Sequence, residues 1–248
     1  MHSLNHARLS VLAIMLVVIP STATRNSASL WAAQDPLDAA LETARKSHDE
    51  TQLQSLKTRL EHKIAQNPED AGSYLALARV HEYLLDVCGM RKDKKAAAAA
   101  VDKAIEAVQR SIQLNDKSAD AHSLLADLYG RKISLGNAMF AGPKYGPKVK
   151  EENAKAMALD DKNPRVWASE GRQYLMTPKM FGGDVARALE SFQKSLAIDP
   201  LQDETWVWLA KAFQKQSNKA KALDAVQRSL QLNPESPFAK ATASELQH

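Results

Sequence analysis

One segment near the C-terminal end, from Asp203 to Pro234, constrains the fold more than any other part of the chain. Its apolar and small residues recur at the intervals that place side chains on one face of an α-helix. Pro234 cannot continue a helix, so it marks the end of the segment. The pattern predicts two antiparallel helices, whose faces hold Trp206, Leu209, Ala210 and Phe213 in the first and Ala222, Val226 and Ser229 in the second.

Three earlier segments match the same template, which indicates an internal repeat. A single helix pair cannot bury its apolar face, so repeated pairs must stack on their neighbours. Glu170 departs from the template, because it takes a position where a large apolar residue is expected. The matching residues are Tyr74, Leu77, Ala78, His81, Ala104, Val108 and Ser111; His122, Leu125, Ala126, Tyr129 and Ala156; and Trp167, Gly171, Tyr174, Ala188, Phe192, Ser195 and Pro200.

With these residues the chain resembles the tetratricopeptide repeat (TPR) family, whose units are a helix A followed by a helix B. The resemblance implies an all-α, TPR-type α-solenoid of antiparallel helix pairs. The resemblance extends from about Asp35 to the end of the chain, and the expected TPR array, with about four units, is residues 69–234. A weaker helical pair is expected at residues 34–68. A C-terminal capping helix is expected at residues 235–248, because the last interface of a repeat array would otherwise be exposed.

The units are longer than those of the family. Their first aromatic or His positions, at Tyr74, His122, Trp167 and Trp206, lie 48, 45 and 39 residues apart, whereas about 34 residues is usual. The spacing from each helix B to the next helix A stays near the template. We therefore expect three insertions as extended A–B turns. Because all A–B turns lie on one edge of a solenoid, they should form a single insertion ridge.

The composition of these insertions makes the ridge a candidate binding surface. A turn held rigid by proline could present Tyr145 or Phe181 to a partner. Alternatively, these rings pack back between the longer helices, which is favoured for Phe181 and left open for Tyr145. Asp184 is expected to cap the following helix. The candidate ridge residues are Arg91, Lys92, Lys144, Tyr145, Lys179 and Phe181.

The family resemblance also implies a concave groove lined by helix A. Its candidate residues here are Arg79, Asp127, Arg165, Arg172 and Lys211. Arginine can hold a carboxylate through two parallel hydrogen bonds, so the last three residues suggest a basic stretch. The alternative is a solvated helix face. The chaperone-binding TPR subclass is not matched, because the Lys and Asn that it requires are missing from the corresponding positions.

Composition and motifs argue against catalysis. The repeats contain no zinc-ligand spacing, no phosphate-binding loop and no nucleophile elbow, so we expect no enzyme activity, no metal and no cofactor. His81 and His122 are interpreted as packed, neutral core residues. Cys88 is the only cysteine, which excludes an intramolecular disulfide. The 33 basic and 29 acidic residues leave a net charge of +4, which does not favour nucleic acid as a partner.

Residues 1–33 predict a signal peptide. Basic residues precede an apolar run at residues 9–19, which is followed by small residues that permit cleavage after Ala23 or Ala33. The run is too short to span a bilayer, which needs about 20 residues. The alternative is an uncleaved anchor, and membrane association is expected only in that case. The protein is otherwise expected to be periplasmic or secreted.

A narrower resemblance supports the same setting. The stretch at residues 155–165, with Thr177-Pro178 and the Phe-Gly-Gly-Asp at residues 181–184, is similar to exported bacterial TPR proteins of unassigned function. We therefore expect an exported, non-enzymatic scaffold that binds a protein or peptide in the bacterial envelope. The alternative is a small or polymeric anionic ligand, such as a cell-wall polymer or lipid headgroups, bound at the ridge and groove.

Overall fold

The structure, a computed structural model, describes residues 36–247. The expected signal peptide lies outside the described residues. Within them the chain forms helices and no strand. The α-helices are α1 (Pro36–Ser47), α2 (Glu50–Gln66), α3 (Ala71–Met90), α4 (Lys94–Leu114), α5 (Ala119–Leu135), α6 (Ala138–Leu159), α7 (Pro164–Met176), α8 (Val185–Ile198), α9 (Asp203–Lys215), α10 (Lys219–Leu232) and α11 (Pro237–Gln247), with a short 3₁₀ helix, η2 (Lys179–Phe181).

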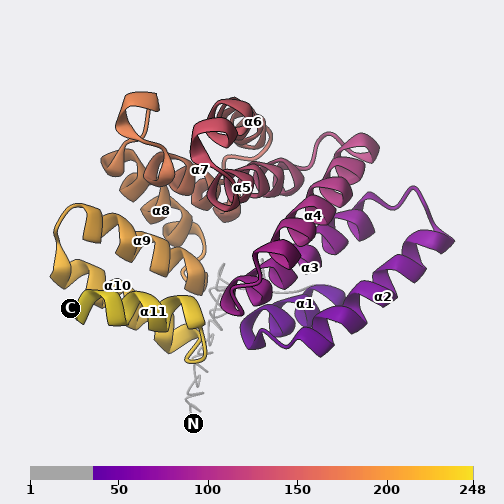
Figure 1. The fold of residues 1–248 in the computed structure, drawn as a ribbon, viewed down its shortest axis with the longest axis horizontal. Coiled ribbons are helices and arrows are strands. Elements are labelled where there is room, and N and C mark those ends of the chain that lie inside the picture. Colours follow the sequence, from indigo (N-terminus) through magenta and orange to yellow (C-terminus); the bar gives the residue numbers. More distant parts are fainter. Residues whose placement is uncertain (1–35, 248) are drawn as a thin grey trace, which may run out of the picture.

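The helices pack as consecutive antiparallel pairs that follow one another along an arc (Figure 1). The first helices of the pairs, α1, α3, α5, α7 and α9, are called A helices here, and their partners α2, α4, α6, α8 and α10 are called B helices. Each A helix also contacts the next A helix, and α11 packs on the last pair. The prediction of an all-α solenoid is confirmed.

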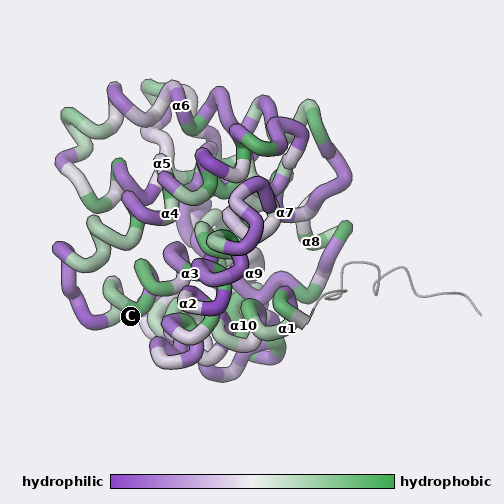
Figure 2. The backbone as a smooth tube through the Cα atoms, turned by 90° about the vertical axis from the view of Figure 1, so that its right-hand side faces the viewer, coloured by the Kyte–Doolittle hydropathy of each residue, from purple (hydrophilic) through white to green (hydrophobic). Residues whose placement is uncertain are grey.

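The hydropathy of the chain fits this arrangement. Hydrophobic and hydrophilic residues alternate along the helices, as expected for helices that bury one face (Figure 2). The buried faces meet in core clusters between neighbouring pairs, with Phe192, Leu128 and Val101 among the fully buried side chains. None of the described helices combines the length and apolar character needed to cross a membrane.

A recurring hydrogen bond explains why three of the four first repeat positions hold Trp or His. The ring nitrogen of Trp167 donates to the carbonyl oxygen of Asp161 at 2.6 Å, and that of Trp206 donates to the carbonyl oxygen of Pro200 at 2.9 Å. His122 Nε2 lies 3.0 Å from the carbonyl oxygen of Asp116. In each case the acceptor is six residues earlier, so the ring ties helix A to the turn before it.

The structure corrects the expectation of three extended turns. Helices α3 and α4 contain 20 and 21 residues and are joined by Arg91–Asp93 alone, while α5 and α6 contain 17 and 22 residues and are joined by residues 136–137. The extra residues of these two pairs therefore lengthen the helices. Only the third pair has an extended turn, residues 177–184, which contains η2.

The second insertion was interpreted as a turn because of its prolines, and this interpretation is wrong. Asn137 caps α6, accepting a hydrogen bond from the Met139 amide at 2.9 Å, and Pro143 and Pro147 lie inside that helix. Proline normally breaks a helix because it removes an amide donor. Both prolines are exposed and four residues apart, so the carbonyl groups that lose a donor lie on the solvent side, where water can replace it.

The two aromatic ridge residues have opposite surroundings. Tyr145 stacks on Tyr129, with ring centroids 5.6 Å apart, and packs against the core between α4 and α5. Phe181 keeps 73% of its surface exposed. The favoured interpretation of Phe181 as a packed ring is therefore wrong. Asp184 caps α8 through the amides of Ala186 and Arg187, as predicted.

Replacing Gly171 by alanine tests how tightly the third pair is packed. An added Cβ would lie 2.5 Å from the Phe192 ring, which is fully buried. We expect Gly171→Ala to lower the free energy of unfolding by about 2 kcal/mol, which is typical of an over-packed core. Urea unfolding measures the change. Gly130→Ala is the matched control, because no atom lies within 4 Å of its added Cβ, and an equal loss in both variants would contradict the packing argument.

Candidate binding surfaces of the solenoid

Charged side chains of the A helices form an ion-pair network on the face where α3, α5 and α7 lie side by side, called the inner face here. Asp120 of α5 forms ion pairs with Arg79 of α3 at 3.4 Å and with Arg165 of α7 at 3.3 Å. Asp86 of α3 pairs with Arg131 of α5 at 2.8 Å. The pairs alternate between neighbouring helices, so they tie three successive units together.

Asp127 anchors the middle of the inner face. Its carboxylate accepts two hydrogen bonds from the Arg172 guanidinium, one of them from Nε at 2.9 Å, and another from the Ser169 hydroxyl at 2.9 Å. Burial alone would lower the pKa of Arg172, but the Asp127 carboxylate outweighs it and raises that pKa. The guanidinium therefore stays charged and fully engaged with Asp127.

Arg45 connects the two ends of the arc. Its guanidinium on α1 lies 2.6 Å from Asp203 and 2.9 Å from Glu204, both in the first turn of α9. Asp203 also accepts a hydrogen bond from the Asn233 amide at 3.0 Å. These contacts, called the Arg45 clasp here, join residues 158 and 159 positions apart. The Arg45 clasp therefore holds α1, at the beginning of the arc, against the first turn of α9, near its other end.

Glu82 is the exception on the inner face. It is partly buried, yet among residues 36–247 its carboxylate forms no ion pair and no side-chain hydrogen bond. Burial and, to a lesser extent, the carboxylates of Asp127 and Asp86 together raise the pKa of Glu82 to about 7, against the opposing effect of Arg131 and Arg79. This carboxyl group therefore titrates near neutral pH.

The structure brings together four of the five candidate groove residues. Arg79, Asp127, Arg165 and Arg172 all belong to the inner-face network, whereas Lys211 pairs with Glu245 of α11 at 3.1 Å. Arg165, Arg172 and Lys211 are thus paired with carboxylates and do not form a free basic stretch. The alternative of a solvated helix face does not hold for Arg172, because its side chain is mostly buried. That these residues bind a partner remains a prediction.

Four candidate ridge residues lie in A–B turns, whereas Lys144 and Tyr145 lie inside α6, and their contacts differ. Arg91 pairs with Glu50 of α2 at 2.7 Å, and Lys92 takes a left-handed backbone conformation with φ of 58°. Lys144 lies over the Tyr145 ring, 5.1 Å from its centroid. Lys179 and Phe181 are exposed in η2. Binding by these residues also remains a prediction.

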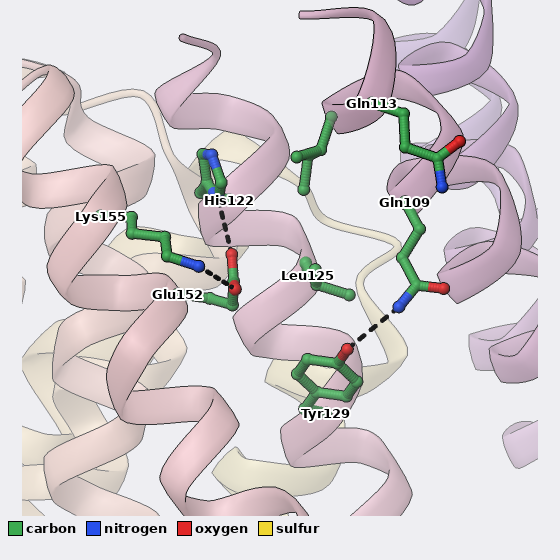
Figure 3. Close-up of a pocket in the computed structure, with 8 residues that line it drawn as sticks. Gln109, Gln113, His122, Leu125, Tyr129, Glu152 and Lys155 are labelled. Atoms are coloured by element: carbon green, nitrogen blue, oxygen red, sulfur yellow. Dashed lines mark hydrogen bonds and ion pairs between the residues drawn. The ribbon is translucent and has the colours of Figure 1, made fainter. Parts of the chain in front are cut away.

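A separate pocket of about 330 Å³ lies between α4, α5 and α6 (Figure 3). His122 Nδ1 is 2.5 Å from Glu152, whose other oxygen accepts from Lys155 at 2.9 Å. His122 Nε2 also faces a carbonyl oxygen. Hydrogen bonds at both ring nitrogens therefore require that His122 and Glu152 together carry two protons. His122 was interpreted as a packed, neutral side chain. It is buried, and both ring nitrogens have hydrogen-bond partners, so packing is confirmed and its neutral charge stays a prediction.

Within residues 36–247, no group of three or more His, Cys, Asp or Glu side chains is arranged to hold a metal ion. Sequence reasoning missed Arg45 and Asp203, because the first unit has a weak repeat signal and the contact spans the whole array. It did not nominate Glu82 or Glu204, although both lie on A helices. Their roles become clear only when the ion pairs formed by the surrounding charged side chains are known.

The fold is similar to that of known solenoids. TTC0263, a thermophilic TPR protein in Thermus thermophilus, matches with a TM-score of 0.64 and 15% identity, over 85% of this chain and 98% of that protein. YrrB, a TPR protein with an unusual peptide-binding site, matches with a TM-score of 0.43 and 12% identity, over 86% and 100%. No family model matches the sequence, and no curated protein matches it. At this identity the first similarity shows the TPR fold alone.

Proposed function

We propose that this TPR-type solenoid is a non-enzymatic interaction scaffold whose inner face binds a basic segment of a protein partner. The observation that carries the proposal is Glu82, an unpaired carboxylate in the middle of a network where the neighbouring charges are already matched. A stacked array of helix pairs offers an extended surface of this kind without requiring a catalytic centre.

The charges of the inner face favour a cationic partner over an anionic one. A partner carboxylate would compete with Asp120 and Asp127 for arginines that already hold them. A Lys or Arg side chain beside Glu82 would instead meet a carboxyl group that has no ion-pair partner among the described residues and whose ionisation is opposed by burial and by the nearby carboxylates of Asp127 and Asp86. Ion pairing there would favour the charged form of Glu82. The structure thus supports the opposite partner charge from the one suggested by the arginines alone.

Selection from a random peptide library tests this proposal. We expect the full chain to enrich peptides that contain Lys or Arg, and Glu82→Gln to weaken the binding of the enriched peptides about tenfold, the usual effect of losing one charge-assisted contact. The matched control is Glu106→Gln, which removes an exposed carboxylate from α4 on the outer side of the array. Enrichment of acidic peptides, or equal binding by both variants, would contradict a basic partner.

We also propose that the protein acts in the bacterial envelope after export. The support is the sequence of residues 1–33, with a basic start, a short apolar run and small residues at its end. Cell fractionation with N-terminal sequencing of the mature protein tests this setting. We expect a periplasmic or secreted chain that begins at residue 24 or 34. An intact N-terminus in the cytoplasmic fraction would exclude it without affecting the proposed binding mode.

A further inference from the structure

Large apolar side chains are exposed at the turns where two A helices lead into their B helices. Met139, Phe140, Met180 and Phe181 each keep more than 70% of their surface exposed, and Met176 keeps 56%. Met139 and Phe140 lie in the first turn of α6, Met176 ends α7, and Met180 and Phe181 lie in the α7–α8 turn. Side chains exposed to this extent cannot line a concavity, so they project from the molecule singly, at the tips of the turns.

The two turns lie level with each other on one edge of the solenoid. Helices α5 and α7 run in the same direction, and their ion pairs join Asp120 to Arg165 and Asp127 to Arg172, a constant offset of 45 residues. Continued to the end of α7, this register places Met176 beside Arg131, one turn before the end of α5. The segments that lead out of α5 and α7 into their B helices, residues 134–150 and 176–183, are called the A–B edge here.

The charge of the A–B edge is mainly positive. Its residues include Lys144, Lys148, Lys150 and Lys179, and the acidic residues Glu151 and Asp184 directly follow its two segments. Within the part of the chain that the structure describes, none of these four lysines forms an ion pair. Lys144 and Lys148 instead lie over the rings of Tyr145 and Tyr129, so their ammonium groups stay near the apolar side chains and remain available to an anionic surface.

The opposite edge, where B helices lead into A helices, has the reverse charge. Its turns contain two lysines, Lys117 and Lys162, and six acidic residues, which are Glu69, Asp70, Asp116, Asp160, Asp161 and Asp199. The basic charge of the A–B edge is thus not a general property of the surface. It occurs together with the projecting Met and Phe side chains.

We infer that the A–B edge binds the surface of an anionic lipid bilayer. Phe140, Met180 and Phe181 would enter the boundary between headgroups and acyl chains, while the four lysines would lie among the lipid phosphates. A fluid bilayer accepts separate projecting side chains without preformed pockets, whereas a protein partner must supply a matching cavity for each of them. This inference concerns a different surface from the inner face, so it does not rest on the proposed peptide binding.

Vesicle co-sedimentation with the full chain tests the inference, because every variant shares the same N-terminal residues. We expect the protein to bind vesicles of phosphatidylglycerol and phosphatidylcholine, and to bind less as salt increases. Phe140→Ser with Phe181→Ser should lower the partition coefficient about tenfold, since two buried rings are lost. Lys144→Gln with Lys179→Gln should also lower it about tenfold.

The opposite edge supplies matched controls. Leu159→Ser with Leu201→Ser removes exposed apolar side chains, and Lys117→Gln with Lys162→Gln removes exposed charges; both should bind vesicles like the parent. Phe140→Trp adds a direct readout, because its fluorescence should shift to the blue on anionic vesicles. Equal loss at both edges, equal binding to neutral phosphatidylcholine vesicles, or binding to soluble polyglutamate that vesicles do not displace would overturn the inference.

Discussion

Replacing Arg45 by methionine is expected to lower the free energy of unfolding by about 3 kcal/mol, because it leaves a buried carboxylate without its partner. The side chain of Asp203 is 2% exposed, and Arg45 and the Asn233 amide are its side-chain partners. Glu204 should contribute little, since its side chain is 42% exposed and exposed pairs are weak. Urea unfolding of the parent and the variant measures the difference.

The matched control is Arg59→Met, which removes an exposed arginine from α2. We expect it to change stability by less than about 0.5 kcal/mol, as surface substitutions usually do. A double-mutant cycle with Asp203→Asn isolates the pair: the double variant should lose less than the sum of the two single losses. Additive losses would show that Arg45 acts through packing of its stem instead of its charge.

The Arg45 clasp should also weaken in acid. Burial alone would raise the pKa of Asp203, but the Arg45 guanidinium and the Asn233 amide outweigh it and lower that pKa. A carboxylate with a lowered pKa in the folded state adds stability above its unfolded pKa, near 4, and loses it as the pH falls through the folded value. The stability difference between the parent and Arg45→Met should therefore be full at pH 6 and shrink below pH 4.

Loss of the clasp should be visible locally as well as globally. Helix α1 packs against its neighbours α2 and α3. The Arg45 clasp is what connects it to α9, near the other end of the arc. We expect faster amide hydrogen exchange in α1 and in the first turn of α9 of Arg45→Met, with little change in α5. Uniform acceleration across all helices would contradict a local clasp.

The fold could be predicted from the sequence because its determinants are local and repeated. The Trp206 and Trp167 positions, the small residue Gly171 and the capping residue Asp184 each act within one helix pair, so a single unit gives their register. The insertions could not be placed in the same way. Proline at positions 143 and 147 is typical of a turn, and only the solvent exposure of both residues shows how a helix accommodates them.

The candidate sites were less predictable because they depend on contacts between units. The position of Arg172 in helix A indicated that it lines the groove, but whether its charge is free depends on Asp127, 45 residues earlier. The Arg45 clasp depends on the curvature of the whole array, which no single repeat contains. Phe181 is exposed because the third pair keeps a true extended turn, whereas Tyr145 lies within a helix and stacks on Tyr129.

Glu82→Gln is expected to remove a pH dependence of stability that the parent shows between about pH 4.5 and 7. Burial and the carboxylates of Asp127 and Asp86 raise the pKa of Glu82 in the folded protein to about 7. Between the two pKa values the folded protein keeps a proton that the unfolded chain has released, so the stability of the parent falls as the pH rises. The shift corresponds to at most about 3 kcal/mol, and partial exposure should reduce the measured effect to about 2 kcal/mol.

Unfolding free energies at pH 5, 6, 7 and 8 measure this effect, with Glu106→Gln as the charge-matched control on an exposed part of α4. Relative to Glu82→Gln, the parent and the control should both lose stability as the pH rises, and most of the loss should be complete at pH 8. A parallel pH profile in all three proteins would show that Glu82 ionises normally.

The same carboxyl group links stability to binding. A basic peptide that pairs with Glu82 should release a proton near pH 6.5, because ion pairing favours the charged form of Glu82. Calorimetry in two buffers of different ionisation enthalpy detects the proton release, and Glu82→Gln should abolish it.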